Sequence, residues 1–285
     1  MSKPTLITSR DDKGLHATKI WEDAYNQAKL TDDRAQRLNE NGGQLKAGLQ
    51  KLIEELSATN QFANEEVRSN YTYPADFKVK PIAEQVTILQ QHFSKLSGAD
   101  LAIASQPLPN GAEGYYAIPR WESIGSTYGE AVEKLLAIIA KQRKFYNYRS
   151  GKLTEKYLRQ HARTSHALDL LAEQQPTHDI LVVAAQFGLK HRGRSVRRAR
   201  EVFASNEFGL GAFAIACMLV THPERLVAYE NLWIDCAGDE YSPGADGQFE
   251  DAPDFSFYDG RLGFGAHWVS DAYDSYGSAS GFSPQ

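Results

Sequence analysis

Apolar residues recur at spacings of three and four along much of the chain, and this spacing places side chains on one face of a helix. The pattern predicts helices around Leu45–Leu56, Ile82–Leu96, Tyr128–Ile139 and Thr154–Ala172. The uninterrupted apolar segment Gly209–Val220 predicts a fully buried helix and is too short to span a bilayer. These segments together favour a core built from helices.

Alternation of apolar and polar residues, which indicates strands, is confined to short stretches. Phe255–Phe264 has Asp259-Gly260 between two alternating arms, so it predicts a β-hairpin with a type I′ turn. Residues 100–118 contain a second candidate hairpin, and Ile180–Phe187 fits either a buried strand or a helix. We therefore expect a mainly α protein, with a multi-helix bundle-like architecture and one or two small β-hairpins.

Breaks in these patterns predict four regions along the chain. Residues 1–17 lack periodicity, which is typical of a flexible N-terminal arm. Helical patterns over 18–97 predict an N-terminal subdomain, and a main α-rich domain follows over 98–269. Gly, Ser, Asp and Tyr dominate 270–285, so we expect a low-complexity tail there.

The net charge of −5 conceals two blocks of opposite sign. Residues 141–200 carry 14 Lys and Arg against 4 Asp and Glu, whereas residues 201–285 carry 2 against 14. Within the basic block, Lys141–Arg163 interleaves aromatic residues with cations, a composition that suits single-stranded nucleic acid. The asymmetry predicts either a surface that faces a polyanion or two blocks that neutralise each other, within the chain or between subunits.

The segment Ile180–Phe203 loosely resembles a DNA-binding helix-turn-helix, whose second short helix exposes basic side chains. In a helix over Ser195–Phe203, the apolar residues fall on one side and the arginines around Arg197 on the other. The candidate contacts to phosphates or base edges are Lys190, Arg192, Arg194, Arg197 and Arg198. This prediction requires an arginine stripe that is open to solvent, because pairing with the protein's own carboxylates favours a structural role instead.

The acidic residues after position 234 suggest a different chemistry, because carboxylates hold the divalent cations of phosphoryl-transfer sites. Asp235, Asp239 and Glu240 are the candidate metal ligands of a metal-dependent nuclease, although the acidic spacing fits no calcium loop. His267 and Asp271 are four residues apart, and we expect a structural hydrogen bond between them. No motif indicates a cofactor, since the GxGxxA match at 209–214 has no strand directly before it.

Three functions are compatible with these patterns. We favour a non-enzymatic, cytoplasmic protein that contacts nucleic acid through its basic block and has no catalytic residue or membrane partner. The second is a structural or interaction protein, whose acidic C-terminal half binds a protein partner or a second copy of the chain. The third is the metal-dependent nuclease. The opening residues contain no stretch typical of a signal peptide, and neither Cys217 nor Cys236 has metal-ligand spacing.

Overall fold

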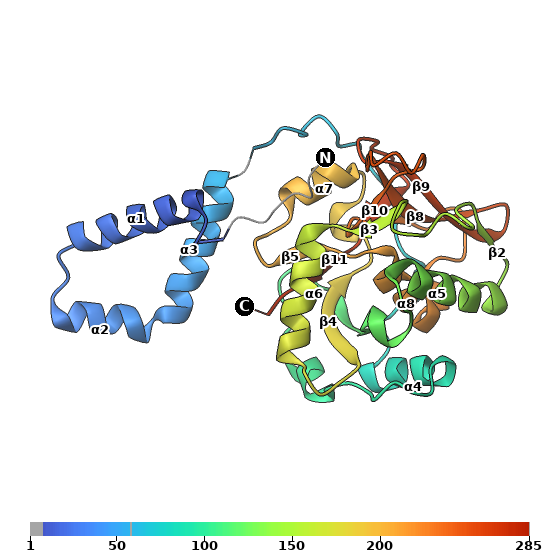
Figure 1. Cartoon of the computed structure of the whole chain (residues 1–285), viewed down its shortest axis with the longest axis horizontal. Coiled ribbons are helices and arrows are strands. Elements are labelled where there is room, and N and C mark those ends of the chain that lie inside the picture. Colours follow the sequence, from blue (N-terminus) through green and yellow to red (C-terminus); the bar gives the residue numbers. More distant parts are fainter. Residues whose placement is uncertain (1–7, 58, 285) are drawn as a thin grey trace. The chain divides into compact units, whose positions relative to one another are not determined.

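The computed structural model describes residues 8–57 and 59–284, and these two ranges form two compact units. The smaller unit, blue in Figure 1, contains the helices α1 (Asp12–Gln27), α2 (Asp32–Glu40) and α3 (Gly42–Ser57). No side chain described in this unit is buried. The helix at Ile82–His92, which the sequence pattern groups with these helices, belongs to the larger unit.

The larger unit contains five described α-helices and four short 3-10 helices. The α-helices are α4 (Ile82–His92), α5 (Tyr128–Gln142), α6 (Ala162–Gln174), α7 (Val196–Val202) and α8 (Ala212–Thr221). The 3-10 helices are η1 (Leu101–Ser105), η2 (Trp121–Ser123), η3 (Leu189–His191) and η4 (Pro223–Arg225). Side-chain oxygens of Thr127 and Ser195 accept backbone hydrogen bonds at the starts of α5 and α7, which fixes where these helices begin.

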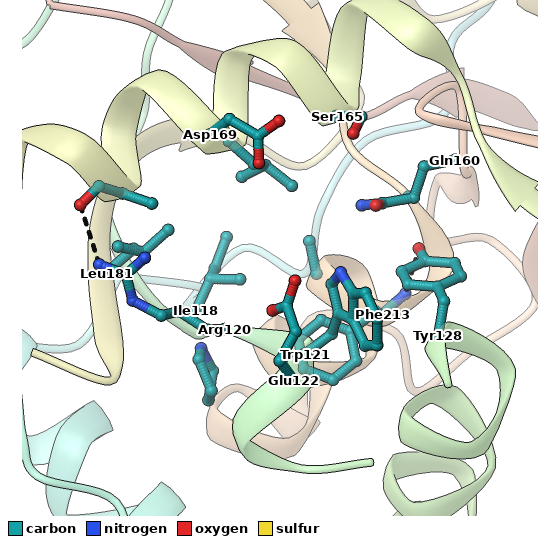
Figure 2. Close-up of a pocket in the computed structure, with 15 residues that line it drawn as sticks. Ile118, Arg120, Trp121, Glu122, Tyr128, Gln160, Ser165, Asp169, Leu181 and Phe213 are labelled. Atoms are coloured by element: carbon teal, nitrogen blue, oxygen red, sulfur yellow. Dashed lines mark hydrogen bonds between the residues drawn. The ribbon is translucent and has the colours of Figure 1, made fainter. Parts of the chain in front are cut away.

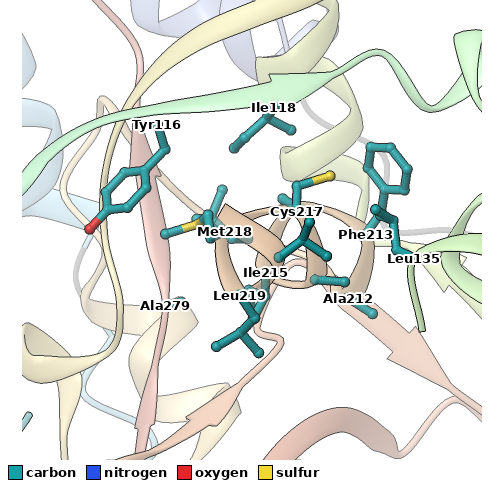
Figure 3. Packing of buried hydrophobic residues seen from close by; sticks show 14 of the residues in the cluster. Tyr116, Ile118, Leu135, Ala212, Phe213, Ile215, Cys217, Met218, Leu219 and Ala279 are labelled. Carbon is teal, nitrogen blue, oxygen red and sulfur yellow. The ribbon is translucent and has the colours of Figure 1, made fainter. Parts of the chain in front are cut away.

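Helix α8 lies at the centre of the larger unit's core. All of its residues are buried because it is apolar on every side, as the sequence predicted. It packs against α4, α5 and β1 (Gly114–Pro119). Figure 3 shows Tyr116 and Ile118 of β1 and Leu135 of α5 around Cys217 and Met218. Among the described residues, no helix is both long enough and apolar enough to cross a membrane.

A four-stranded antiparallel sheet supports one side of this core. Its strands, in order across the sheet, are β1, β4 (Ile180–Gln186), β11 (Ser280–Phe282) and β5 (Glu207–Gly209). Every residue of β4 is buried, which explains why its sequence is apolar from Ile180 to Ala185 rather than alternating.

The second sheet brings together seven described strands. They are β2 (Phe145–Asn147), β3 (Leu158–Gln160), β6 (Trp233–Asp235), β7 (Asp239–Tyr241), β8 (Asp251–Tyr258), β9 (Arg261–Trp268) and β10 (Tyr276–Ser278). Strand β8 pairs antiparallel with β9, β6 and β7, while β10 joins β6 and β2 joins β9 in parallel. Asp259 and Gly260 have φ of +52° and +67°, as a type I′ turn requires, so the predicted hairpin is confirmed.

The expected mainly α, bundle-like fold is wrong. The chain is 40% helical and 20% strand, and its sheets of four and seven strands make it a mixed α/β protein. Many of the strands have three residues, which is too short for an alternating pattern to be visible in the sequence. Their partners are also distant along the chain, so no local turn signal marks them.

Three local predictions also need correction. The candidate hairpin at 100–118 is instead η1 followed by β1, and β1 pairs with β4. The helix expected from Thr154 begins at Ala162, after β3. Residues 276–282, in the expected low-complexity tail, form β10 and β11, whose Gly and Ser residues fit closely packed sheet positions.

Candidate functional site

The arginine stripe on α7 is paired with the protein's own carboxylates. The Arg197 guanidinium binds Glu65, with Nε at 2.9 and 2.8 Å from its two carboxylate oxygens. Arg198 Nε lies 2.6 Å from Glu66, and its Nη1 lies 2.9 Å from Glu201. Arg194 Nε is 3.3 Å from the same Glu66 oxygen. The stripe is therefore paired with the protein's own carboxylates, the arrangement that favours a structural role, although 39% of the Arg197 side chain remains exposed.

The two remaining predicted contacts also have partners within the larger unit. Lys190 Nζ lies 2.5 Å from Glu207, whose other carboxylate oxygen is 2.7 Å from His191 Nε2. Burial raises the pKa of Glu207, but the opposing effect of His191 and Lys190 is larger. The pKa therefore falls from 4.5 to about 2. Arg192 donates to the backbone carbonyl of Tyr71 at 3.1 Å. Nucleic-acid contact through these side chains stays a prediction. A phosphate would have to compete with the hydrogen bonds and ion pairs that they already form within the chain.

The structure does not bring the three candidate metal ligands together. Glu240 pairs with Arg159 at 2.7 Å. Asp239 accepts hydrogen bonds from the Tyr128 hydroxyl and from the backbone N–H of Ala212 at the start of α8. Asp235 instead faces His267. Within 8–57 and 59–284, no group of three or more His, Cys, Asp or Glu side chains is arranged to hold a metal ion.

A different site lies on one face of the seven-stranded sheet. Asp254 of β8 is directly opposite Asp235 of β6 on one side and Gly265 of β9 on the other. Directly opposed residues share a face, so these three positions form a row across the sheet. The alternate residues Phe255 and Phe264 are fully buried in the core on the other face. The sheet therefore separates an apolar face from a polar one.

Two glycines keep the middle of this polar face free of side chains. A Cβ at Gly265 would lie 2.9 Å from Asp254 Oδ2, closer than carbon and oxygen tolerate. A Cβ at Gly263 would lie 3.2 Å from both the Ser256 hydroxyl and the Tyr148 ring. Because strand β9 has no side chain at either position, a cleft remains along it.

Aromatic rings form much of the wall of this cleft, which we call the aromatic cleft. Its volume is about 590 Å³. The Trp233 ring lies perpendicular to Tyr276 at 5.1 Å and to Tyr229 at 5.4 Å between centroids. Three of its tyrosines are about half exposed. The residues that line it are Tyr148, Arg149, Tyr229, Trp233, Asp254, Ser256, Gly265, Ala266, His267, Tyr273, Ser275 and Tyr276.

At the floor of the aromatic cleft, the His267 ring lies between two carboxylates. Its Nε2 is 3.3 Å from Asp235 Oδ1, and its Nδ1 is 3.5 Å from Asp254 Oδ2. The Tyr276 hydroxyl donates to Asp254 at 3.2 Å. Burial raises the pKa of Asp235 to about 7. Although burial alone lowers it, the pKa of His267 rises to about 9 because both carboxylates stabilise the imidazolium.

Several buried polar atoms at the cleft have no hydrogen-bond partner. Among the described residues they are the donors Trp233 Nε1 and Arg149 Nε, whereas His267 Nε2 and Asp235 Oδ1, which also lack a hydrogen bond, face each other as an ion pair. Folded proteins pair about 90% or more of such groups, so the two unpaired donors are candidates for a partner that the described chain does not supply.

No local pattern in the sequence predicts this site. His267 was expected to pair with Asp271, but Asp271 instead accepts from the Tyr273 hydroxyl at 2.9 Å, and that prediction is wrong. For Asp235 the sequence predicts only a metal-binding role. The glycines alternating with Phe264 in the predicted hairpin were the available signal, since they leave one strand face bare. Compared with protein-family models, curated proteins and solved structures, the chain matches none.

Proposed function

We propose that the aromatic cleft binds a carbohydrate. A sugar ring has apolar C–H faces that stack on aromatic side chains and hydroxyl groups that pair with polar ones. The cleft offers both, with Trp233 and Tyr229 as rings and Ser256 and Asp254 as hydrogen-bonding groups. The observation that carries the proposal is the unpaired Nε1 of Trp233, a buried donor beside exposed aromatic surface.

The charges at the cleft favour a neutral ligand. Arg149 and the imidazolium of His267 are its cations, and Asp254 and the underlying Asp235 are its anions. Arg149 already donates to the carbonyl of Ala266 at 2.7 Å. With cations and anions nearly balanced, the cleft has no excess positive charge to attract a phosphate backbone. Polyhydroxyl compounds satisfy the same polar groups without a charge penalty.

The carboxylate geometry favours binding over hydrolysis. Glycosidases place two carboxyl groups on either side of the scissile bond, with space for the sugar between them. Asp235 and Asp254 are cross-strand neighbours that approach the same imidazole, and Asp235 has no exposed surface. They therefore act together to hold His267 and Tyr276 in place, and we infer a binding protein rather than a glycosidase.

Affinity gel electrophoresis in neutral polysaccharides tests this proposal. We expect at least one of a β-glucan, a xylan and a mannan to slow the native protein. Trp233→Ala and Tyr229→Ala remove stacking surface and should abolish the retardation. Trp268→Ala is the matched control, because Trp268 is 64% exposed but does not line the cleft.

Two results would contradict the proposal. One is a protein that no polysaccharide retards. The other is equal loss of retardation in the Trp268→Ala and Trp233→Ala variants. Single-stranded oligonucleotides serve as competitors in the same gels, because Tyr148 belongs to the basic, aromatic stretch noted in the sequence. Binding to them alone, lost on Trp233→Ala, would assign the cleft to nucleic acid instead.

A further inference from the structure

A second cavity, separate from the aromatic cleft, lies between the end of β1, η2 and helices α6 and α8 (Figure 2). Its volume is about 250 Å³, below the roughly 300–1,000 Å³ of pockets for drug-sized ligands. Ile118, Leu168 and Leu181 give it an apolar floor. The cavity is thus sized for a small molecule with an apolar body.

Two carboxylates reach this cavity without a partner. Figure 2 shows Asp169 of α6 and Glu122 of η2 directed toward the same space. Neither forms a hydrogen bond or ion pair within the described chain, and both are exposed at the cavity's mouth. With Arg120 as the one cation among the lining side chains, the two carboxylates leave an excess of one negative charge, which a ligand's cation would neutralise.

The nearby groups that favour anions are already occupied. The Arg120 guanidinium donates to the backbone carbonyls of Ala172, Gln175 and His178 at 2.8–3.0 Å. The N-terminus of α8 is capped by Asp239, which accepts from the Ala212 N–H at 2.7 Å. The donors that remain include the neutral side chains of Gln160 and Ser165, which form no hydrogen bond within the described chain, so an anionic ligand would meet two carboxylates with no unpaired cation to offset them.

Aromatic rings form the wall opposite α6. The rings of Trp121 and Tyr128 are perpendicular, with centroids 6.1 Å apart, and Phe213 lies 6.3 Å from Tyr128. Ring faces attract cations, most strongly where water is excluded. The apolar floor, the aromatic wall and the two unpaired carboxylates together favour a ligand that has an apolar body and a positive charge.

We propose that this cavity binds a small organic amine. Its ammonium group lies between Asp169 and Glu122, and its apolar body rests against Phe213 and Leu181. This proposal is independent of the carbohydrate proposal, because none of the residues lining this cavity lines the aromatic cleft.

Calorimetric titration of the full chain with three matched probes tests the inference. Phenethylamine should bind at least tenfold more tightly than phenethyl alcohol, and phenylacetate should bind more weakly still. Asp169→Asn should weaken phenethylamine binding at least tenfold and leave the alcohol unchanged. Glu173→Gln is the control, since Glu173 lies on the same helix outside the cavity.

A second readout guards against an effect on folding. Bound amine should change the fluorescence of Trp121, and Trp121→Phe should remove that change. The unfolding midpoint of Asp169→Asn without ligand should stay as in wild type, because the Asp169 side chain is exposed and forms no bond within the described chain. The inference is overturned if phenethylamine does not bind, if the alcohol binds equally well, or if Asp169→Asn has no more effect than Glu173→Gln.

Discussion

Asp235 Oδ1 lies 3.3 Å from Nε2 of His267, and the Asp235 side chain has no exposed surface. The imidazolium is thus the nearest counter-charge to a carboxylate that water does not reach. The pKa of Asp235 rises from 3.8 to about 7 through burial. The pKa of His267 rises from 6.5 to about 9 because Asp235 and Asp254 outweigh the effect of its burial.

These raised pKa values predict that stability falls as pH rises. The folded chain binds more protons than the unfolded chain, so the contribution of Asp235 is lost between about pH 4 and 7 and that of His267 between about pH 6.5 and 9. Chemical denaturation at pH 7 and 9.5 should show a loss of about 2 kcal/mol in the free energy of unfolding. His161 and His222 do not interfere, because burial lowers the pKa of each to about 4.

Asp235→Asn identifies the source of this pH dependence. The amide removes the charge that raises the pKa of His267, so the variant should lose much less stability between pH 7 and 9.5 than the wild type. An identical loss in both proteins would place the titrating group elsewhere.

Gly265→Ala should disturb the floor of the aromatic cleft. The new Cβ would lie 2.9 Å from Asp254 Oδ2, so the carboxylate must turn away from Tyr276. We expect the unfolding free energy to fall by about 1 kcal/mol and polysaccharide retardation to be lost. Gly48→Ala, a helical site with nothing within 4 Å of the added carbon, should leave both unchanged or raise stability slightly. Retained binding by Gly265→Ala would separate Asp254 from ligand recognition.

The ion pairs of α7 predict that its arginines do not bind nucleic acid in the wild type. Because Glu65 and Glu66 already neutralise Arg197 and Arg198, the wild type should show no arginine-dependent shift of duplex DNA in native gels. Glu65→Gln with Glu66→Gln removes the counter-charges of Arg197 and Arg194 and leaves Arg198 paired with Glu201 alone, so it should create an affinity that falls steeply with salt. Changing Arg194, Arg197 and Arg198 to Ala in that background should remove it. Wild-type binding that the same three Ala changes abolish would support the nucleic-acid interpretation of the sequence.

Asp239 should stabilise the fold without a metal ion. Asp239→Ala removes the acceptor for the Tyr128 hydroxyl and the Ala212 N–H, so we expect a loss of about 2–3 kcal/mol in unfolding free energy. Thermal unfolding with millimolar Mg²⁺ and with a chelator should give the same midpoint for the wild type. A midpoint that Mg²⁺ raises in the wild type but not in Asp239→Ala would revive the metal-site hypothesis.

The elements that could be predicted from the sequence are those marked by neighbouring residues, through periodicity, a capping residue or a turn dipeptide. Helix α8 is apolar all round, α5 begins at a capping residue, and the β8–β9 hairpin has Asp-Gly at its turn. The division of α7 was also visible, since Val196 and Ala199 are fully buried opposite the arginines. The carboxylates that pair with those arginines were not predictable, because Glu65 lies 132 residues before Arg197.

The aromatic cleft escaped prediction because sheet pairing assembles it. Asp235 and Tyr276 lie on β6 and β10, two strands of three residues that pair in parallel across a long connection. No periodicity appears in so few residues, and no turn links the two strands. The composition of residues 270–285 predicts a low-complexity tail. In the structure, β10 and β11 from this segment pair within the two sheets, and Tyr273, Ser275 and Tyr276 line the aromatic cleft.

Fluorescence of Trp233 alone tests the carbohydrate proposal most directly. The chain has four tryptophans, so changing Trp21, Trp121 and Trp268 to Phe leaves Trp233 as the single indole. On titration with an oligosaccharide of the polysaccharide that retards the wild type, we predict a saturable change in Trp233 emission. An emission spectrum that stays constant at oligosaccharide concentrations sufficient to abolish gel retardation would contradict binding in the aromatic cleft.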